Sequence, residues 1–159
     1  MKELFSDAEK TAYKKTLLQQ CIELIEMRIA ANTAAIANAQ EAANAEEKSS
    51  AGDKYETSRA MSHLEKDMHS RQLTANRMEL AALFGLDCSS LYSEGAKGSL
   101  VVCADCSFFI AAGLGKINFE SREIYLLSPD APLAALLYKK KVGDSILFNK
   151  KLCVITSVF

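Results

Sequence analysis

The chain has 159 residues, of which 49% are hydrophobic and 25% charged, which excludes global disorder and leaves room for one large domain or two small ones. The formal net charge is −1, without the basic excess of a free-standing nucleic-acid binder, so we expect any contact with nucleic acid to be indirect, through a protein partner. We expect a cytoplasmic protein, because the N-terminus does not resemble a signal peptide, no apolar run could span a membrane, and the five cysteines are an odd number.

The first half of the chain is expected to begin with a long helix. Residues 1–84 contain no proline, and Gly52 is the only glycine before Gly85, so the two residues that most often interrupt helices are nearly absent. Mostly apolar residues recur at alternating intervals of four and three, which indicates a helix packed lengthwise on another. The positions are Leu18, Ile22, Ile25, Ile29, Asn32, Ile36, Ala39 and Ala43.

A second heptad pattern predicts another helix after Gly52. Its positions are Met61, Leu64, Met68, Arg71, Ala75, Met78 and Ala82. A polar segment separates the two patterns, and a short connection makes two long helices antiparallel neighbours. We therefore expect residues 1–84 to form an arm, an antiparallel helical hairpin (coiled coil) with its tip near 44–54. The alternative is a four-helix bundle in which a second copy supplies two of the helices.

The second half, residues 85–159, is expected to be a small β-rich domain. β-Branched and aromatic residues predict its strands, and Pro132 suits the first turn of a short helix. In chain order we expect strands within Ser99–Ala112 and Lys116–Leu127, a helix over Leu133–Lys139, and a closing hairpin of Ile146–Phe148 and Leu152–Val158. The predicted fold class is α+β, with a long helical hairpin followed by a mostly antiparallel sheet and one short helix.

The segment from Leu127 to Asp144, L-S-P-D-A-P-L-A-A-L-L-Y-K-K-K-V-G-D, resembles the C-terminal signature of the Gre-type bacterial transcription elongation factors. In that family a Ser-Pro segment leads into a short helix, a Gly-Asp turn and a last hairpin. A helical hairpin precedes them, in the same order and at nearly the same total length. The resemblance covers almost the whole chain and is specific over Ser128–Val158. Tyr138 departs from the family pattern, which usually has glycine there.

The resemblance implies an FKBP-like C-terminal domain that docks at the rim of the secondary channel of bacterial RNA polymerase. The coiled coil then enters the channel, where acidic residues at its tip help to hold a catalytic Mg²⁺ and promote cleavage of backtracked RNA. Carboxylates are hard oxygen ligands that suit Mg²⁺. Because this chemistry belongs to the polymerase, the resemblance implies a protein that is not itself an enzyme and needs no cofactor beyond the shared Mg²⁺. It also implies a monomer with no membrane contact.

The candidate acids near the tip are Asp53, Glu56, Glu46 and Glu47. When the chain is aligned on Tyr55, the two acidic positions of the family fall on Lys48 and Ala51, neither of which is a carboxylate. Asp53 and Glu56 are three residues apart, so they could share one face of the second helix and assist Mg²⁺ binding. They also suit a capping box, in which Asp53 caps the helix and Glu56 reaches back. A factor that occupies the channel without stimulating cleavage is therefore the alternative.

The resemblance places the polymerase-docking surface within Ser128–Val158. The candidate docking residues are Ser128, Pro129, Pro132, Leu133, Lys139, Lys140, Gly143 and Asp144. Lys139, Lys140 and Lys141 could contact an acidic surface of the polymerase. They could equally serve the short helix, because cations are favourable near a helix C-terminus.

Two other sets of residues, a pair of cysteines and a pair of histidines, are candidate sites. Cys103 and Cys106 form a CxxC motif, which can bind zinc or carry redox chemistry. We expect a structural role, because the motif lies in an apolar β run without a second CxxC, and residues i and i+3 face opposite sides of a regular strand. His63 and His69 are expected to be solvated residues of the second helix.

Two functions from other classes remain as alternatives. The first is a non-catalytic adaptor or oligomeric coiled-coil protein, in which the hairpin pairs with another hairpin. The second is a prolyl isomerase, which would need an apolar aromatic pocket that the sequence does not indicate.

Overall fold

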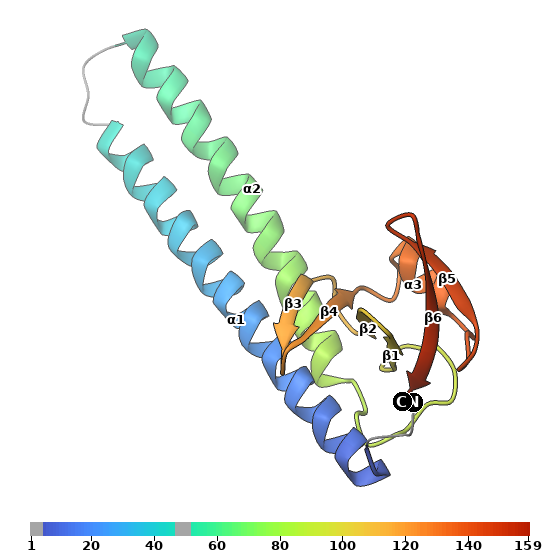
Figure 1. Cartoon of the computed structure of the whole chain (residues 1–159). Coiled ribbons are helices and arrows are strands. Elements are labelled where there is room, and N and C mark those ends of the chain that lie inside the picture. The colour runs from blue at the N-terminus through green and yellow to red at the C-terminus, as the bar shows by residue number, and fades with distance from the viewer. Residues whose placement is uncertain (1–4, 47–51) are drawn as a thin grey trace. The chain divides into compact units, whose positions relative to one another are not determined.

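The computed structural model describes residues 5–46 and 52–159 and confirms the expected fold class, α+β (Figure 1). Two long helices come first, α1 (Asp7–Glu46) and α2 (Gly52–Phe84), and six strands with the short helix α3 (Pro132–Leu137) follow. The chain divides into two compact units. We call residues 23–81 the hairpin unit, and residues 1–22 together with 82–159 the sheet unit.

The start of α1 belongs to the sheet unit, which differs from the expected division between residues 84 and 85. Lys14, Leu17 and Cys21 are fully buried there. The Tyr13 ring meets the Phe119 ring edge-on, with 5.2 Å between their centroids. A heptad pattern shows that one face of a helix is covered but not what covers it, so the sequence could not separate these first turns from the arm.

The expected seam of α1 is confirmed. Four of its eight positions are buried, namely Ile22, Ile25, Ala39 and Ala43, and the other four, Leu18, Ile29, Asn32 and Ile36, are half-buried. Toward the C-terminal end of α1 the buried positions are alanines, which have little side chain to hold a second helix at a distance.

The expected seam of α2 is wrong. Met61, Leu64, Met68 and Met78 are 59%, 68%, 48% and 70% exposed, and the other three positions are exposed as well. A different heptad series is covered instead: Ser62, Lys66, His69, Leu73, Asn76, Leu80 and Leu83. Lys66 is tolerated on this inward face because its long apolar stem packs while its ammonium donates to Gln40 of α1 at 2.8 Å.

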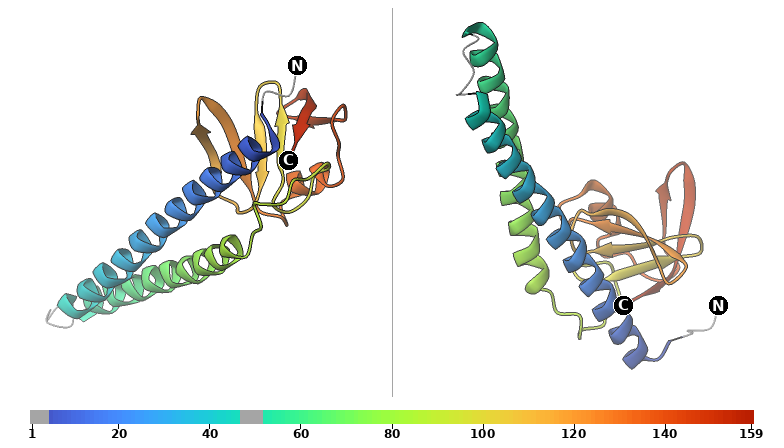
Figure 2. Two further views of the ribbon diagram at one scale, coloured as in Figure 1. Left: turned by 90° about the horizontal axis from the view of Figure 1, so that it is seen from below. Right: turned by 90° about the vertical axis from the view of Figure 1, so that its left-hand side faces the viewer.

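The sheet unit contains one six-stranded sheet with the strand order β3-β4-β2-β1-β6-β5 (Figure 2). The strands are β1 (Leu100–Cys103), β2 (Ser107–Ile110), β3 (Gly115–Phe119), β4 (Arg122–Leu127), β5 (Ser145–Phe148) and β6 (Lys151–Val158). Only β2 and β4 pair in parallel, so the expected mostly antiparallel sheet is confirmed. Every residue of the central strands β1 and β2 is buried, which means that both faces of the sheet are covered there.

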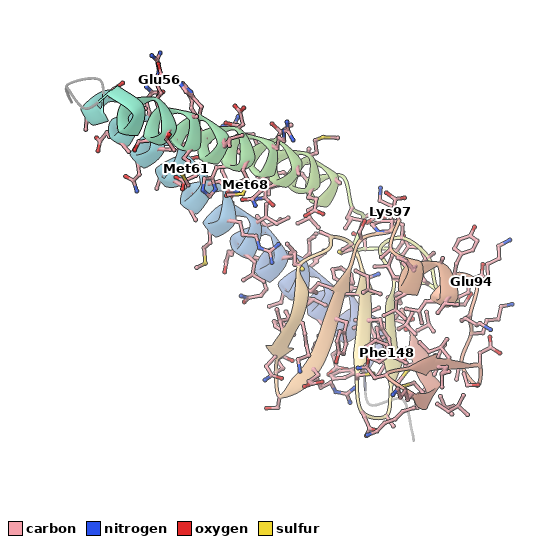
Figure 3. The ribbon with its side chains drawn as sticks, turned by 90° about the horizontal axis from the view of Figure 1, so that it is seen from above. Glu56, Met61, Met68, Glu94, Lys97 and Phe148 are labelled. Carbon is pink, nitrogen blue, oxygen red and sulfur yellow. The ribbon has the colours of Figure 1, made fainter. Side chains whose placement is uncertain are left out.

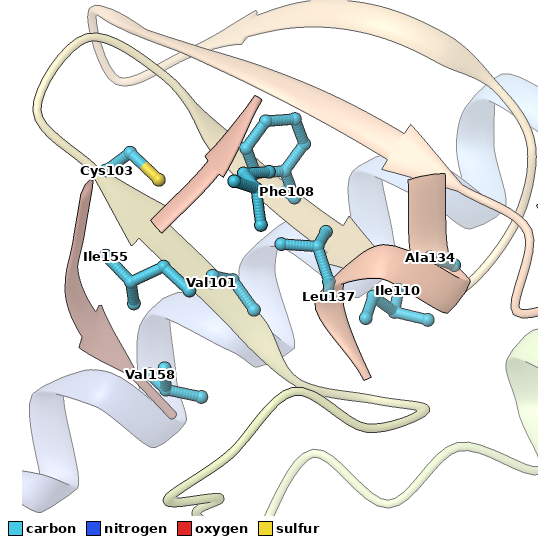
Figure 4. Close-up of a cluster of buried hydrophobic side chains, with 9 residues drawn as sticks. Val101, Cys103, Phe108, Ile110, Ala134, Leu137, Ile155 and Val158 are labelled. Atoms are coloured by element: carbon cyan, nitrogen blue, oxygen red, sulfur yellow. The ribbon is translucent and has the colours of Figure 1, made fainter. Parts of the chain in front are cut away.

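One apolar core of the sheet unit lies between the central strands, α3 and the β5–β6 hairpin (Figure 4). It comprises Val101, Cys103, Phe108, Ile110, Ala134, Leu137, Ile146, Ile155 and Val158. Three aromatic rings pack at its edge, since Phe108, Tyr125 and Phe148 have centroids 4.8–5.6 Å apart. Contacts of this kind stabilise an interior beyond the area that they bury.

Helix α3 is shorter than the expected range of Leu133–Lys139. It starts at Pro132, whose missing N–H costs nothing in a first helical turn. It ends at Leu137 because the next residue, Tyr138, leaves the helical region with a ψ of 128°, and Lys139 then follows with a positive φ of 61°. The chain segment around Gly95 then pairs with the residues that follow the helix. The Gly95 N–H donates to the Lys140 carbonyl and the Lys139 N–H donates to the Gly95 carbonyl, both at 2.8 Å.

None of the described helices is both long enough and apolar enough to cross a lipid bilayer.

Candidate functional site

The four candidate tip acids fall at or beside the ends of the two long helices. Glu46 is the last residue of α1, and Glu47 lies outside the described residues. Helix α2 starts at Gly52, so Asp53 is its second residue and does not occupy the N-cap position that a capping box requires. Glu56 follows in α2 with its side chain exposed (Figure 3). The backbone spacing keeps Asp53 and Glu56 three residues apart on one helix, where such positions are neighbours.

The candidate docking residues at the start of the signature form a turn that leads into α3. The Asp130 N–H donates to the Ser128 hydroxyl at 3.4 Å, and the Ala131 N–H donates to the Ser128 carbonyl at 3.0 Å. Pro129 and Pro132 are exposed, whereas Leu133 is half-buried and packs against the apolar core. Ser128 and Leu133 therefore shape this turn, and the two prolines lie at its surface.

The Gly143–Asp144 pair builds the turn before β5. The Lys141 N–H donates to the Asp144 carboxylate at 2.8 Å, and the Asp144 N–H donates to the Lys141 carbonyl at 3.0 Å. Gly143 has a φ of 93°, in the region that favours glycine, and its N–H donates to the Ile155 carbonyl at 2.9 Å. Both residues therefore position the β5–β6 hairpin, and both are exposed at its turn.

An exposed apolar face on the β5–β6 hairpin was missed from the sequence. Leu147 and Leu152 are cross-strand partners and are each 67% exposed, and Val154, two residues further along β6, is 47% exposed. On the opposite face of the same hairpin, Ile146 is buried in the apolar core. The run of three apolar residues from Ile146 to Phe148 was the available signal, because a surface strand normally alternates between apolar and polar residues. We call Leu147, Leu152 and Val154 the hairpin face.

Several lysines are close in sequence to the residues of the hairpin face. Lys150 and Lys151 are exposed at the β5–β6 turn, and Lys139 is exposed after α3. Lys140 is half-buried, and the Lys141 ammonium lies 3.8 Å from the Glu94 carboxylate. The Lys139 ammonium lies 5.4 Å from the centre of the Tyr138 ring, where the ring's negative face attracts it.

The CxxC motif spans a turn between two strands. Cys103 ends β1 and Cys106 precedes β2, and the Cys103 N–H donates to the Cys106 carbonyl at 2.9 Å. The expectation that the two cysteines face opposite sides of one strand is therefore wrong. The Cys153 thiol of β6 lies near both. Burial, reinforced by Cys153, raises the pKa of Cys103 to about 11, and burial, reinforced by both neighbouring thiols, raises the pKa of Cys106 to about 12.

The Cys103 and Cys106 thiols are poorly suited to nucleophilic chemistry or metal binding. A thiolate is the form that attacks substrates and binds metals, and raised pKa values keep Cys103 and Cys106 protonated. Within residues 5–46 and 52–159, no group of three or more His, Cys, Asp or Glu side chains is arranged to hold a metal ion.

The two histidines of α2 differ in their surroundings. His63 is exposed as expected, but His69 is half-buried, and its Nδ1 atom is buried without a hydrogen-bond partner. His69 is therefore a seam residue and not a solvated one. A shallow recess of about 460 Å³ nearby is lined by Asp67, Ser70, Arg71 and Thr74, which all belong to α2.

Comparison of the chain with protein-family models, with curated proteins and with solved structures finds no match among any of them. Any function therefore has to be argued from the residues themselves and from the resemblance that they carry.

Proposed function

We propose that this chain is a transcription elongation factor of the Gre type, which binds bacterial RNA polymerase and inserts its hairpin unit into the secondary channel. The observation that carries the proposal is the order of elements over Ser128–Val158. There a Ser-Pro turn, helix α3, the Gly143–Asp144 turn and the β5–β6 hairpin follow one another as the resemblance implies. Helices of 40 and 33 residues precede them, in the place where the family has its coiled coil.

The sheet unit would dock on the polymerase through the hairpin face and the neighbouring lysines. Exposed apolar side chains supply contact area at the centre of an interface, and the charges around them steer the encounter and fix its orientation. Leu147, Leu152 and Val154 fit the first role. Lys139, Lys150 and Lys151 fit the second if the polymerase surface is acidic.

The tip of the hairpin unit would act in the polymerase active centre. Asp53 and Glu56 are three residues apart near the start of α2, so both can lie on one side of the helix and assist one metal ion. Mg²⁺ commonly takes one or two carboxylates together with phosphate and water oxygens. The factor would add a carboxylate to a metal that the polymerase already holds, so it would be neither an enzyme nor a cofactor-binding protein by itself.

A cleavage assay on backtracked elongation complexes of the cognate polymerase tests the proposal. The wild-type chain should shorten the nascent RNA, and the variant Asp53→Ala/Glu56→Ala should not. The matched control is Glu26→Ala/Glu65→Ala, which also removes two exposed acids from the long helices but away from the tip and should keep the activity.

Binding is measured alongside cleavage. A chain that binds the polymerase and competes with a genuine Gre factor, yet shortens no RNA, would be a channel-occupying regulator. If it neither cleaves nor competes, the proposed function is wrong.

A further inference from the structure

The outward face of α2 carries an apolar stripe that nothing in the hairpin unit covers. It consists of Met61, Leu64, Met68, Arg71, Ala75 and Met78, which we call the α2 ridge, and all six residues are exposed. Figure 3 shows Met61 and Met68 on this helix. The four large apolar side chains of the ridge are 48–70% exposed, and they repeat at heptad spacing over five turns. A heptad stripe is the pattern of a helix that packs lengthwise on another helix.

The α2 ridge is complementary to itself when it is read in the reverse direction. If two copies of α2 run antiparallel about a twofold axis between residues 69 and 70, each ridge position meets a ridge position of the other copy. Met61 then faces Met78, Leu64 faces Ala75, and Met68 faces Arg71. In this register each large side chain of one ridge faces a residue of the other ridge. The same patch on both copies can therefore form a symmetric (isologous) contact.

The charges on the ridge favour this direction over the parallel one. In a parallel pair, Arg71 would face Arg71 of the second copy in the middle of the contact, and like charges that face each other there are unfavourable. In the antiparallel pair, Arg71 faces the unbranched and adaptable Met68. The Asp67 carboxylate of the second copy then lies one position away, so it can pair with the guanidinium.

We propose that α2 pairs with α2 of a second copy of this chain, antiparallel and centred between residues 69 and 70. The occupant of the ridge is thus another copy of the protein. The pairing stands on the ridge alone and holds whether or not the chain binds a polymerase. If both proposals hold, the paired form is a resting state, and separation of the two copies frees α2.

Two charge substitutions at one position test both the pairing and its direction. In Met68→Lys, each new ammonium faces Arg71 of the second copy, so association should weaken at least tenfold. In Met68→Glu, each new carboxylate faces the same Arg71 and should keep association within a fewfold of wild type. Both variants lose the same methionine and gain one exposed charge, and far-ultraviolet circular dichroism checks that the helices remain folded.

Sedimentation equilibrium over a range of protein concentrations supplies the readout. The wild-type chain should move from one copy, 17.4 kDa, toward twice that mass as concentration rises. Met68→Lys should stay at one copy, and Met68→Glu should follow wild type. The double variant Met68→Lys/Arg71→Glu should regain the dimer, because the introduced ammonium of each copy then faces the introduced carboxylate of the other.

Three results would overturn the proposal. A wild-type chain that stays at one copy at high concentration would leave the α2 ridge to a different partner. A dimer that tolerates Met68→Lys as well as Met68→Glu would form through another surface. Loss of the dimer in both Met68 variants would rule out the antiparallel register. None of these results bears on the RNA cleavage assay, so the two proposals fail separately.

Discussion

The Lys66 ammonium of α2 donates a hydrogen bond to the Gln40 Oε1 of α1 at 2.8 Å and so links the two helices of the hairpin unit. Gln40 in turn donates from its Nε2 to the Asn44 Oδ1 at 3.0 Å. Both Lys66 and Gln40 are half-buried, on a face where heptad packing normally places apolar side chains. A cation in such a place depends on its partner, because a desolvated donor left without an acceptor is costly.

Loss of that acceptor should destabilise the hairpin unit. We expect Gln40→Leu to lower the free energy of unfolding by about 1 kcal/mol, since Lys66 then has no acceptor from Gln40. The double variant Gln40→Leu/Lys66→Met should recover most of this loss, because both polar groups are replaced by apolar ones. Thermal unfolding followed by far-ultraviolet circular dichroism measures the change. Equal losses in the single and double variants would show that Lys66 without this acceptor carries no cost of its own, contrary to the expected result.

His69 is expected to be a site where an apolar side chain improves stability. Its Nδ1 is buried without a hydrogen-bond partner, so His69→Leu should raise the free energy of unfolding by about 1 kcal/mol. His63→Leu is the matched control on the same helix and should change stability little, because His63 is exposed. The same thermal unfolding experiment compares the two, and a destabilised His69→Leu would show that Nδ1 has a partner in solution, such as water.

The difference between α1 and α2 shows where a heptad pattern decides a fold and where it does not. In α1 a single stripe from Ile22 to Ala43 is apolar except at Asn32, so its inward face could be predicted from the sequence. In α2 two stripes have heptad spacing, and the more apolar one faces outward. The inward stripe contains Lys66 and His69, and the pairing of Lys66 with Gln40 depends on a helix far away in the chain. Hydrophobicity alone therefore selects the wrong face.

The Cys103–Cys106 turn and the β5–β6 hairpin also depend on contacts between distant parts of the chain, which the sequence alone does not reveal. The turn between Cys103 and Cys106 contains neither glycine nor proline, so the apolar run appeared continuous and the motif was placed inside one strand. The closing β5–β6 hairpin was predicted from its composition, but its exposed face was not. Whether Leu147 or Ile146 points outward depends on the register that β6 makes with β1.

Alkaline pH is expected to destabilise the protein through Cys21. Burial raises the pKa of this thiol from 9.0 to about 12, so the folded state favours the protonated form. The stability that follows is fully present below pH 9 and is lost as pH rises toward 12, because the unfolded chain releases this proton first. At about pH 10 the loss from this one thiol is roughly 1 kcal/mol.

Guanidinium unfolding at about pH 7 and about pH 10 measures that loss. The variant Cys21→Ala removes the thiol, so its stability should fall by roughly 1 kcal/mol less than that of wild type between the two pH values. The comparison across pH cancels any cost of the smaller side chain itself. The same pH dependence in both proteins would show that Cys21 is not the group responsible.

Gly95 is expected to tolerate no side chain. A Cβ at this position would lie 1.9 Å from the Leu137 carbonyl oxygen, and Gly95 also pairs with Lys139 and Lys140 through its backbone. We expect Gly95→Ala to lower the free energy of unfolding by about 2 kcal/mol or more, because backbone on both sides must shift. Lys97→Ala is the nearby control; its side chain is exposed, and its effect should stay within about 0.5 kcal/mol. Chemical denaturation of the two variants compares them directly.

The hairpin face should matter for polymerase binding and not for folding. Leu147 is 67% exposed, so a substitution there changes the surface of the hairpin. Ile146, the residue before it in β5, is the one whose side chain is buried in the core. Leu147→Asp should leave the melting temperature within a few degrees of wild type, since no core contact is lost, yet should weaken polymerase binding at least tenfold. A charge placed in the apolar centre of an interface must be desolvated without a partner, which costs affinity. Pull-down and titration with the purified polymerase measure the effect, and Asn118→Asp, at an exposed position of the distant strand β3, adds the same negative charge as a control for a general change of surface charge. Unchanged binding by Leu147→Asp would show that the polymerase contacts another part of the sheet unit.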